Sequence, residues 1–366
     1  MTESSAWSIP FEPDVVIVGA GIAGLAAAAE LVANGRRVVV LEKSRGVGGR
    51  MATRRVGEAV CDHGAQFFTV RGRAFGGIVA EAHDAGAVSQ WCDGFSRATA
   101  NGSGMLPPGD GHPRWRGTSG MTDLPKHLAA ALDAAHASLR CNTKVASIGI
   151  RDGRARLTLD DGAAIDAAGA ILTAPVPQSL DLMAAGGMMA PGAAAIDGDA
   201  LRKLSAIDYD PCFALMLVLA RPSRVPPPGG IQFEAEGPAN GPIAWLADNQ
   251  QKGISTVPSI TIHATAAFSR QHYDSPPDDV AALLVAAAAP WLDGPPETAI
   301  VERSLHRWKF SHPTLLVSEP LVAASTNPPI VCCGDAFAGP KVEGAASSGL
   351  AAARWIERVL RAGAAS

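Results

Sequence analysis

Residues 14–24 read DVVIVGAGIAG, and this stretch decides the fold. The apolar, β-branched run at 15–18 is typical of a buried parallel strand, and glycines in the spacing G-x-G-x-x-G follow it directly. The alanine-rich stretch 25–33 predicts a helix, and residues 37–41, RVVVL, predict a second strand that ends at Glu42. Strand, glycine turn, helix, strand and terminal acid in this order predict a βαβ dinucleotide-binding unit.

Each glycine of this turn has its own physical role. Gly19 permits the tight turn, Gly21 lets the backbone approach a pyrophosphate, and Gly24 lets the helix pack close to the strand. The helix N-terminus offers free N–H groups and a partial positive charge to the phosphates. Glu42 follows Gly19 by 23 residues, where its carboxylate can accept hydrogen bonds from both ribose hydroxyls. An acid at this position favours FAD or NAD over NADP.

A second glycine-rich loop follows the acid and favours FAD over NAD. Residues 43–51 read KSRGVGGRM. A flavin dinucleotide extends beyond its pyrophosphate, and Gly48 and Gly49 would let the backbone close over that extension. Arg50 would add charge-assisted hydrogen bonds to phosphate.

The far end of the chain repeats the pattern. Residues 330–333 read IVCC and predict a strand. We expect its two adjacent cysteines to serve in packing and not in redox catalysis. Gly334 and Asp335 follow, and the turn 339–345, GPKVEGA, opens a helix that runs to about Leu360. Asp335 could accept a hydrogen bond from a ribityl hydroxyl, and the N–H groups of 342–345 could face the pyrimidine edge of a flavin. Both chain ends are therefore expected to build one cofactor domain.

The pattern as a whole predicts an α/β fold with two domains. One is a Rossmann-like FAD-binding domain, and the other is an α+β substrate domain with a mixed or antiparallel sheet. We expect a helix over 74–90, a strand over 140–150 that returns to the cofactor sheet, and strands 213–219 and 259–265 in a second sheet. The predicted boundaries are 1–75, 138–178 and 326–366 for the FAD-binding domain, and 76–137 and 179–325 for the substrate domain.

Composition excludes several classes of protein. The chain has 366 residues, of which 47% are hydrophobic and 18% charged, so it can bury a substantial core. A net charge of −4 gives no basic field for nucleic acid. The six cysteines form no CxxC pair and no metal-ligand spacing, which indicates a reducing compartment and no metal. The N-terminus has no basic signal region and no apolar run reaches the ~20 residues of a membrane span. We expect a cytoplasmic protein without membrane or nucleic-acid partners.

The sequence resembles the renalase family of the flavin amine oxidase-like superfamily, and most closely its bacterial branch. The resemblance covers nearly the whole chain and rests on runs at 43–51, 61–68, 114–121, 173–177, 262–265, 306–308 and 334–345. It implies the two-domain fold of hydroxybenzoate hydroxylase-like flavoproteins and non-covalent FAD. It also implies oxidation of misreduced dihydro-NAD(P), the 2- or 6-dihydro isomers, back to NAD(P)+, with dioxygen or a quinone taking the electrons. Ala336 and Phe310 depart from the family pattern and bear on substrate shape.

The motifs and the resemblance together give a set of cofactor-binding residues. Val145 is included for a contact on the adenine side, although a plain core valine fits the sequence equally well. The full set is Gly19, Gly21, Ile22, Ala23, Gly24, Glu42, Lys43, Gly49, Arg50, Met51, Ala65, Gln66, Phe67, Val145, Gly334, Asp335, Val342, Glu343, Gly344 and Ala345.

The reaction implied by the resemblance needs no general base, because a dihydropyridine becomes an aromatic cation when it loses a hydride. We expect Gln66 to reach the flavin, and Asn249 to bond a carboxamide unless it only makes a turn. His263 is a candidate at the site or a hydrogen-bonded core histidine. Further candidates to wall the pocket are Trp245, Trp308 and Phe310.

Two other functions stay open on the sequence alone. The first is an amine or secondary-metabolite oxidase on the same fold, although only two tyrosines are present to frame an amine. The second is a non-catalytic FAD-binding protein used for scaffolding or sensing.

Overall fold

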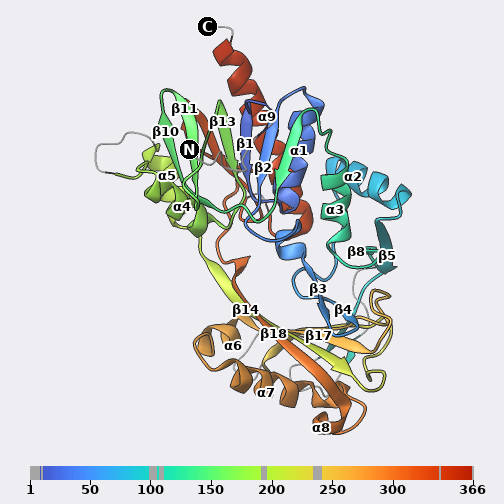
Figure 1. Ribbon diagram of the computed structural model, residues 1–366. Coiled ribbons are helices and arrows are strands. Elements are labelled where there is room, and N and C mark those ends of the chain that lie inside the picture. Colours follow the sequence, from blue (N-terminus) through green and yellow to red (C-terminus); the bar gives the residue numbers. More distant parts are fainter. Residues whose placement is uncertain are drawn as a thin grey trace, which may run out of the picture. The chain divides into compact units, whose positions relative to one another are not determined.

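The computed structural model describes residues 9, 11–98, 105–106, 111–190, 196–233, 241–337 and 339–364. The chain divides into two compact units (Figure 1). The first contains Met1–Gly49, Pro125–Asp208 and Pro313–Ser366, and the second contains Arg50–Leu124 and Tyr209–His312. Both ends of the chain and a central segment therefore belong to one unit.

The first unit is built on a six-stranded sheet in the order β19-β20-β13-β1-β2-β9. All neighbours pair in parallel except β19 with β20. The central strands are short and fully buried, as their apolar, largely β-branched sequences predict. The strands are β1 (Val15–Val18), β2 (Val38–Leu41), β9 (Ala137–Arg140), β13 (Gly169–Leu172), β19 (Val322–Thr326) and β20 (Pro329–Cys332).

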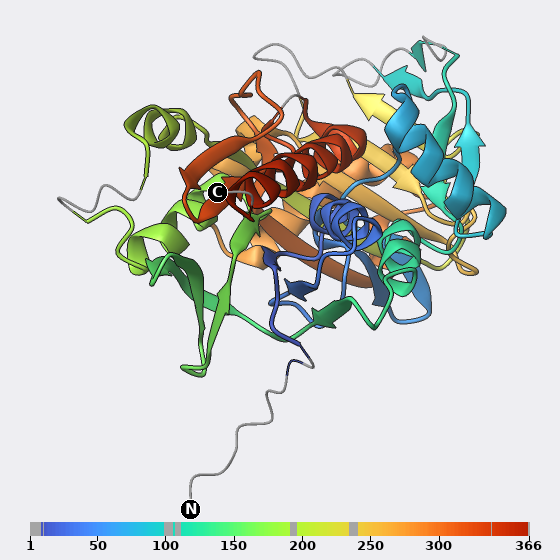
Figure 2. The same ribbon diagram turned by 90° about the horizontal axis from the view of Figure 1, so that it is seen from above.

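Two helices pack closely on this sheet, α1 (Ile22–Ala33) and α9 (Lys341–Ala364). They lie side by side in both Figure 1 and Figure 2. Gly349 of α9 makes this approach possible, because a Cβ atom there would overlap the carbonyl of Ala23. The unit is completed by α4 (Val176–Ala185), α5 (Gly198–Ser205) and a three-stranded sheet of β10 (Val145–Arg151), β11 (Arg154–Leu159) and β12 (Ala164–Ala167).

The second unit is built on a seven-stranded sheet in the order β18-β14-β17-β16-β15-β6-β7. Its longest strands are β14 (Tyr209–Leu219) and β18 (Ile300–Pro313). The other strands of the sheet are β6 (Ser96–Ala98), β7 (Met105–Leu106), β15 (Gly230–Phe233), β16 (Ile243–Asp248) and β17 (Ser259–Ala264). The helices are α2 (Arg73–Asp84), α3 (Asp123–Ala130, which crosses the unit boundary), α6 (Ala266–Gln271), α7 (Pro277–Ala288), α8 (Pro296–Ala299) and the 3-10 turns Gly49–Met51 and Ala289–Trp291. Two small sheets, β3 (Thr53–Val56) with β4 (Ala59–Asp62) and β5 (Val88–Cys92) with β8 (Arg114–Gly117), complete it.

Strand β17 places apolar side chains on one face of this sheet and polar side chains on the other. Its sequence SITIHA alternates, so Ile260, Ile262 and Ala264 point one way and join the apolar core formed with α7. Ser259, Thr261 and His263 point the other way. A polar face of an antiparallel sheet normally meets water, yet Ser259 and Thr261 are fully buried. The polar face of β17 is therefore covered by other parts of the unit.

Two sequence-based expectations were wrong. The helix predicted over 74–90 ends at Asp84, because Gly86 adopts φ 74° and the following residues form β5. The strand predicted over 140–150 is two strands, since Asn142 adopts φ 52° between β9 and β10. Only β9 belongs to the six-stranded sheet, whereas β10 pairs with β11. The strands predicted over 213–219 and 259–265 are confirmed.

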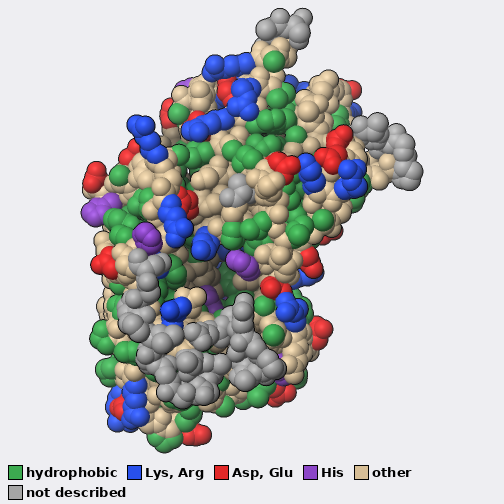
Figure 3. All heavy atoms as spheres, turned by 180° about the vertical axis from the view of Figure 1, so that it is seen from behind, with side chains coloured by type: hydrophobic (Ala, Val, Ile, Leu, Met, Phe, Trp, Pro, Cys, Tyr) green, Lys and Arg blue, Asp and Glu red, His purple; other side chains and the backbone are tan. Residues whose placement is uncertain are grey.

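The compact units do not follow the predicted domain boundaries everywhere. The first segment of the first unit ends at Gly49, so residues 50–75 belong to the second unit. Residues 125–137, 179–208 and 313–325, predicted for the substrate domain, belong to the first unit. Among the described residues, no helix has both the length and the apolar character that a membrane crossing requires. On the face drawn in Figure 3, charged side chains of both signs are mixed with apolar ones.

Candidate active site

The predicted cofactor residues of the first unit meet at one edge of its sheet. Parallel strands β1, β2, β13 and β20 are in register, with Val18 opposite both Leu41 and Leu172 and with Leu172 opposite Cys332. Gly19, Glu42 and Gly334 follow the carboxyl ends of three of these strands. Strand β1 lies between β2 and β13, so the chain turns to opposite sides of it. Ligands of open α/β sheets bind at such a switch point.

The glycine turn after β1 has the geometry that its sequence predicts. Gly19 adopts φ +105°, and a Cβ on Gly24 would overlap the Gly19 carbonyl. A Cβ on Gly21 would meet no described atom within 4 Å, so the backbone there borders open space. Gly21 is also the N-cap of α1, with no side-chain cap and no acidic residue in the first helical turn. The helix end is therefore suited to receive a phosphate.

Glu42 is buried beside this turn. One carboxylate oxygen accepts a hydrogen bond from Ala20 N at 2.9 Å, and the other accepts one from Ser44 N at 2.8 Å. Each oxygen keeps a second lone pair that a ribose hydroxyl could use. Lys43, in contrast, donates to Gln178 at an exposed position.

The C-terminal turn repeats the close approach seen after β1. Gly339 adopts φ +130°, and a Cβ on Gly344 would overlap its carbonyl, just as Gly24 would overlap Gly19. In both turns a glycine with positive φ precedes by five residues a glycine in the first turn of a helix. Asp335 is buried next to Gly334, and the contact of Gly349 with Ala23 brings the two helices together. These features fit a dinucleotide cofactor held by both ends of the chain.

Other predicted residues of this unit lie in its interior. Val145 is buried at the start of β10. Cys332 and Cys333 are free thiols, and burial raises the pKa of Cys332 to about 12. A protonated, buried thiol is a packing group, as predicted from the sequence.

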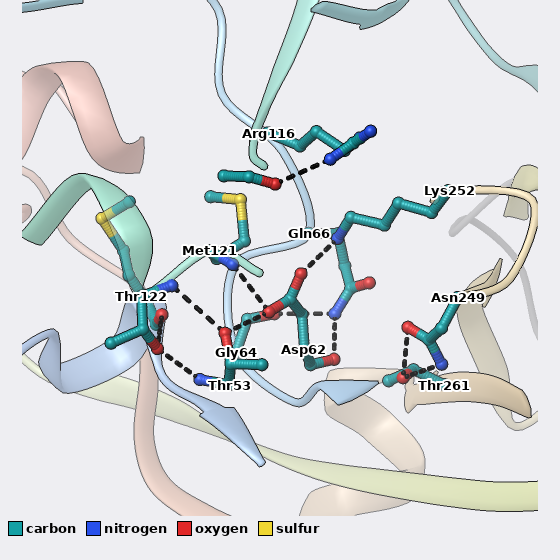
Figure 4. Close-up of polar contacts among 12 residues, drawn as sticks. Thr53, Asp62, Gly64, Gln66, Arg116, Met121, Thr122, Asn249, Lys252 and Thr261 are labelled. Atoms are coloured by element: carbon teal, nitrogen blue, oxygen red, sulfur yellow. Dashed lines mark hydrogen bonds and ion pairs between the residues drawn. The ribbon is translucent and has the colours of Figure 1, made fainter. Parts of the chain in front are cut away.

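The second unit contains a buried polar cluster around Asp62 and Lys252 (Figure 4). Lys252 Nζ lies 2.6 Å from Asp62 Oδ2, and both side chains are fully inaccessible to solvent. Asp62 Oδ1 accepts hydrogen bonds from Thr53 Oγ1 at 2.6 Å and from Met121 N at 2.8 Å. Burial lowers the pKa of Lys252, while Asp62 acts in the opposite direction. The charge of the Asp62 carboxylate is thus compensated by Lys252, and the carboxylate accepts two further hydrogen bonds inside the unit.

Gln66 and His263, both predicted site residues, are part of the same cluster. Gln66 Nε2 donates to the carbonyl of Asp62 at 2.6 Å and lies 3.4 Å from His263 Nε2. Burial lowers the pKa of His263 to about 4, so the ring is neutral at neutral pH. The structure therefore brings these two candidates into contact.

Three aromatic rings form a cluster in the same unit. The His63 and Trp308 rings are stacked at 5.2 Å, and His306 contacts both edge-on. Trp308 Nε1 donates to the His63 carbonyl at 2.7 Å. Burial, and after it His306 and Arg54, lower the pKa of His63 to about 3. Phe310, two residues further along β18, instead contacts Tyr209.

Trp245 belongs to a second aromatic group in this unit. It lies opposite His263 in the β16–β17 register and packs against Phe67, Trp91 and Phe95. Its indole Nε1 is buried without a hydrogen-bond partner among the described residues. Ala65 N donates a hydrogen bond to the Arg50 carbonyl at 2.8 Å. Met51 is buried in the adjoining 3-10 turn.

Asn249 is placed differently from its predicted role. It is fully buried, and its amide exchanges hydrogen bonds with Thr261 Oγ1. The carboxamide contact stays a prediction, and the structure shows this side chain already engaged.

Sequence reasoning missed Lys252 and the role of Asp62. Lys252 stands in a polar loop segment, DNQQKG, with nothing local to indicate burial. The available signal was the charged Asp62 at the end of an apolar strand, which needs a partner when buried. Among the described residues no group of three or more His, Cys, Asp or Glu side chains could hold a metal ion.

Comparison with protein families gives two matches. Residues 17–81 match the NAD(P)-binding Rossmann-like domain, and residues 86–356 match the flavin containing amine oxidoreductase family. The second match covers more than half of the chain.

Curated relatives are similar only over a short segment. Putrescine oxidase of Kocuria rosea is 52% identical over 58 residues, which is 16% of this chain and 12% of that protein. A putative flavin-containing monoamine oxidase of Mycobacterium tuberculosis is 52% identical over 58 residues, 16% of this chain and 13% of its own length. The similarity thus spans about an eighth of these relatives.

Solved structures share the fold over nearly the whole chain. A putative protoporphyrinogen oxidase from Exiguobacterium superposes with a TM-score of 0.69 at 15% identity and covers 94% of this chain and 98% of its own. Putrescine oxidase bound to putrescine gives 0.67 at 14% identity, with 95% and 99% coverage. A fatty acid isomerase from P. acnes gives 0.68 at 12% identity, with 96% and 99% coverage. Proteins named for such different substrates leave the substrate to be argued from the site.

Proposed function

We propose a substrate for this chain, which belongs to the flavin containing amine oxidoreductase family and is an FAD-dependent oxidoreductase. The proposed substrate is a misreduced dihydronicotinamide dinucleotide, the 2- or 6-dihydro isomer of NAD(P)H. It gives up a hydride and becomes NAD(P)+, and the two electrons pass on to dioxygen or a quinone. When bound, FAD supplies the hydride-accepting chemistry.

This proposal rests on the way in which the buried carboxylates of the second unit are already paired. An amine substrate is a cation, and a site for it is expected to present a carboxylate. Asp62 is paired with Lys252 and holds two further donors. Asp248, the other buried carboxylate in the described part of this unit, accepts from Ser223 Oγ and Gln251 N. Neither carboxylate is available to an ammonium group.

Proton transfer leads to the same substrate class. An amine must lose a proton before it can be oxidised, whereas a dihydropyridine only donates a hydride. The histidines of the cluster are weak bases, because burial lowers the pKa of His263 to about 4 and that of His63 to about 3. A reaction without proton abstraction suits these side chains better than amine oxidation does.

The first unit would hold the cofactor through its two glycine turns. The first turn of α1 would bind the pyrophosphate, and Glu42 would accept the ribose hydroxyls. Met51, Ala65 and Phe67 stay proposed contacts, as do Ile22, Ala23, Val342, Glu343 and Ala345.

Amine oxidation is the second candidate, and the family match favours it. A small amine would then replace the dinucleotide as electron donor, with dioxygen as acceptor. The two candidates differ in the charge and the protonation that the substrate brings.

An anaerobic half-reaction decides between them. The FAD-loaded protein is mixed without air with 2- and 6-dihydro-NAD(P), and separately with a panel of amines that includes putrescine. We expect the dihydronicotinamides to bleach the flavin absorption band and to yield NAD(P)+. Bleaching by an amine, with no change on adding the dihydronicotinamides, would overturn the proposal.

A further inference from the structure

Gln66 holds its side-chain amide in one fixed orientation. Its Nε2 lies 2.6 Å from the carbonyl oxygen of Asp62 and 3.1 Å from that of Gly64 (Figure 4). Carbonyl oxygens only accept hydrogen bonds, so the nitrogen must face them. Turning the amide over would set its own oxygen against two other oxygens. The positions of the backbone therefore determine where Gln66 Oε1 points.

His263 reinforces this orientation. Its Nε2 lies 3.4 Å from Gln66 Nε2, and this ring nitrogen can only act as an acceptor toward an amide N–H. The neutral state of the ring, due to its burial, is consistent with that role. His263 thus lies at the nitrogen end of the amide, whereas Oε1 has no described donor.

The backbone that fixes Gln66 is itself firmly held. Asp62, whose carbonyl receives the amide, is bonded through its side chain to Lys252, Thr53 and Met121. Gly64 cannot be replaced without overlap, because a Cβ there would meet the Arg50 carbonyl. The segment from Asp62 to Gln66 is therefore a rigid support for the amide.

Gln66 Oε1 has no hydrogen-bond partner among the described residues, although the side chain is only 5% exposed. A buried carbonyl without a donor is unfavourable and requires an explanation. Trp245 is the cross-strand partner of His263, and its Nε1 is a buried donor that also lacks a described partner. An unpaired acceptor and an unpaired donor thus belong to two residues that both neighbour His263.

We propose that Gln66 and Trp245 together recognise a primary carboxamide on the substrate, with Gln66 as the specificity-determining residue. The carboxamide N–H donates to Gln66 Oε1, and its carbonyl accepts from Trp245 Nε1. This assignment rests on the proposed function, because a dihydronicotinamide and its oxidised product carry this group. It assigns to Gln66 the contact that sequence alone gives to Asn249.

Two product analogues separate the two hydrogen bonds. NAD+ carries the carboxamide, and its 3-acetylpyridine analogue keeps the carbonyl but replaces the N–H₂ with a methyl group. Dissociation constants for both are measured by isothermal titration on the FAD-loaded full chain. We expect the wild type to bind NAD+ about tenfold more tightly than the analogue, equivalent to about 1.4 kcal/mol.

Variants assign each bond to its residue. Gln66→Met keeps the side-chain length and removes the amide, so it should abolish the preference for NAD+. Trp245→Phe removes the indole N–H and should weaken both ligands by a similar factor. Gln90→Met alters an exposed glutamine of the same unit and should leave the preference unchanged. Unfolding curves confirm that each variant is folded.

The outcomes distinguish this inference from the proposed function. Binding of both dinucleotides by the wild type without a preference would overturn the carboxamide contact alone, and this result needs no variant. A preference that persists in folded Gln66→Met would do the same, and would indicate that Oε1 is paired with buried water. Absence of binding by either dinucleotide would overturn both the substrate class and this contact.

Discussion

At the scale of single residues, Asp62 and Lys252 form a buried ion pair. The two side chains are fully buried and 2.6 Å apart, and Lys252 Nζ lies 5.0 Å from the centre of the Trp91 ring. A buried pair adds little to stability relative to apolar residues, but breaking it leaves an uncompensated charge. Its value here is the support that it gives to the turn bearing Gln66.

This pair gives a testable prediction. Lys252→Met should lower the free energy of unfolding by about 3–5 kcal/mol, because Asp62 is left buried without its counter-ion. Adding Asp62→Asn in the same chain should restore most of that loss. Denaturant unfolding measures both variants, with Lys203→Met, on the surface of the first unit, as the control. A double variant no more stable than Lys252→Met would show that charge compensation is not what the pair provides.

His63 and His263 predict a loss of stability in mild acid. The pKa of His63 is lowered from 6.5 to about 3 and that of His263 from 6.5 to about 4, both mainly by burial. Above pH 6.5 both residues are neutral in the folded and unfolded states. Between pH 6.5 and about 4 the unfolded chain binds protons that the folded chain does not bind. The free energy of unfolding therefore decreases as the pH is lowered through this range.

The slope measures the effect of each ring. One histidine contributes up to about 1.4 kcal/mol per pH unit in this range. The free energy of unfolding is measured at several pH values from neutral down to about pH 5. It should fall less steeply as the pH is lowered for His263→Asn than for the wild type. Equal slopes would mean that His263 takes up its proton over the same pH range in the folded and the unfolded protein.

At the scale of elements, the two glycine turns explain how distant parts of the sequence form one edge of a sheet. Gly19 with Gly24, and Gly339 with Gly344, each bring a helix start onto the preceding turn. Sequence reasoning reached both turns, because glycine spacing is a local signal. It failed where a single positive φ divided an element, as at Gly86 after α2 and at Asn142 between β9 and β10.

The first turn offers a matched set of glycine variants. Gly21→Ala meets no atom within 4 Å and has an ordinary φ of −75°, so the protein should fold with unchanged stability. The added methyl would nevertheless stand where a pyrophosphate approaches, so FAD affinity should fall by at least about tenfold. Gly24→Ala should destabilise the fold itself, since its Cβ overlaps the Gly19 carbonyl.

Gly198→Ala, in the first turn of α5, is the control. Its Cβ also meets no atom within 4 Å, and both stability and FAD affinity should be retained. Thermal unfolding and FAD titration are measured for all three variants. If Gly21→Ala binds FAD as tightly as Gly198→Ala, the open space at Gly21 does not receive the phosphates.

At the scale of the whole molecule, the sequence was most informative about the first unit and least informative about the polar cluster of the second. The βαβ unit is continuous in the chain, so its parts could be recognised together. Asp62 and Lys252 are 190 residues apart, and the contact between them follows from tertiary structure alone. The contact of Gln66 with His263 spans 197 residues, so each was a candidate by itself but their pairing was not predictable.

The central claim is that the two ends of the chain hold one FAD molecule. The most direct test is the flavin content of the purified full-length protein, measured by absorption before and after denaturation. We predict one FAD per chain, released unmodified because no covalent bond retains it. A colourless protein that takes up no FAD during titration would contradict the account.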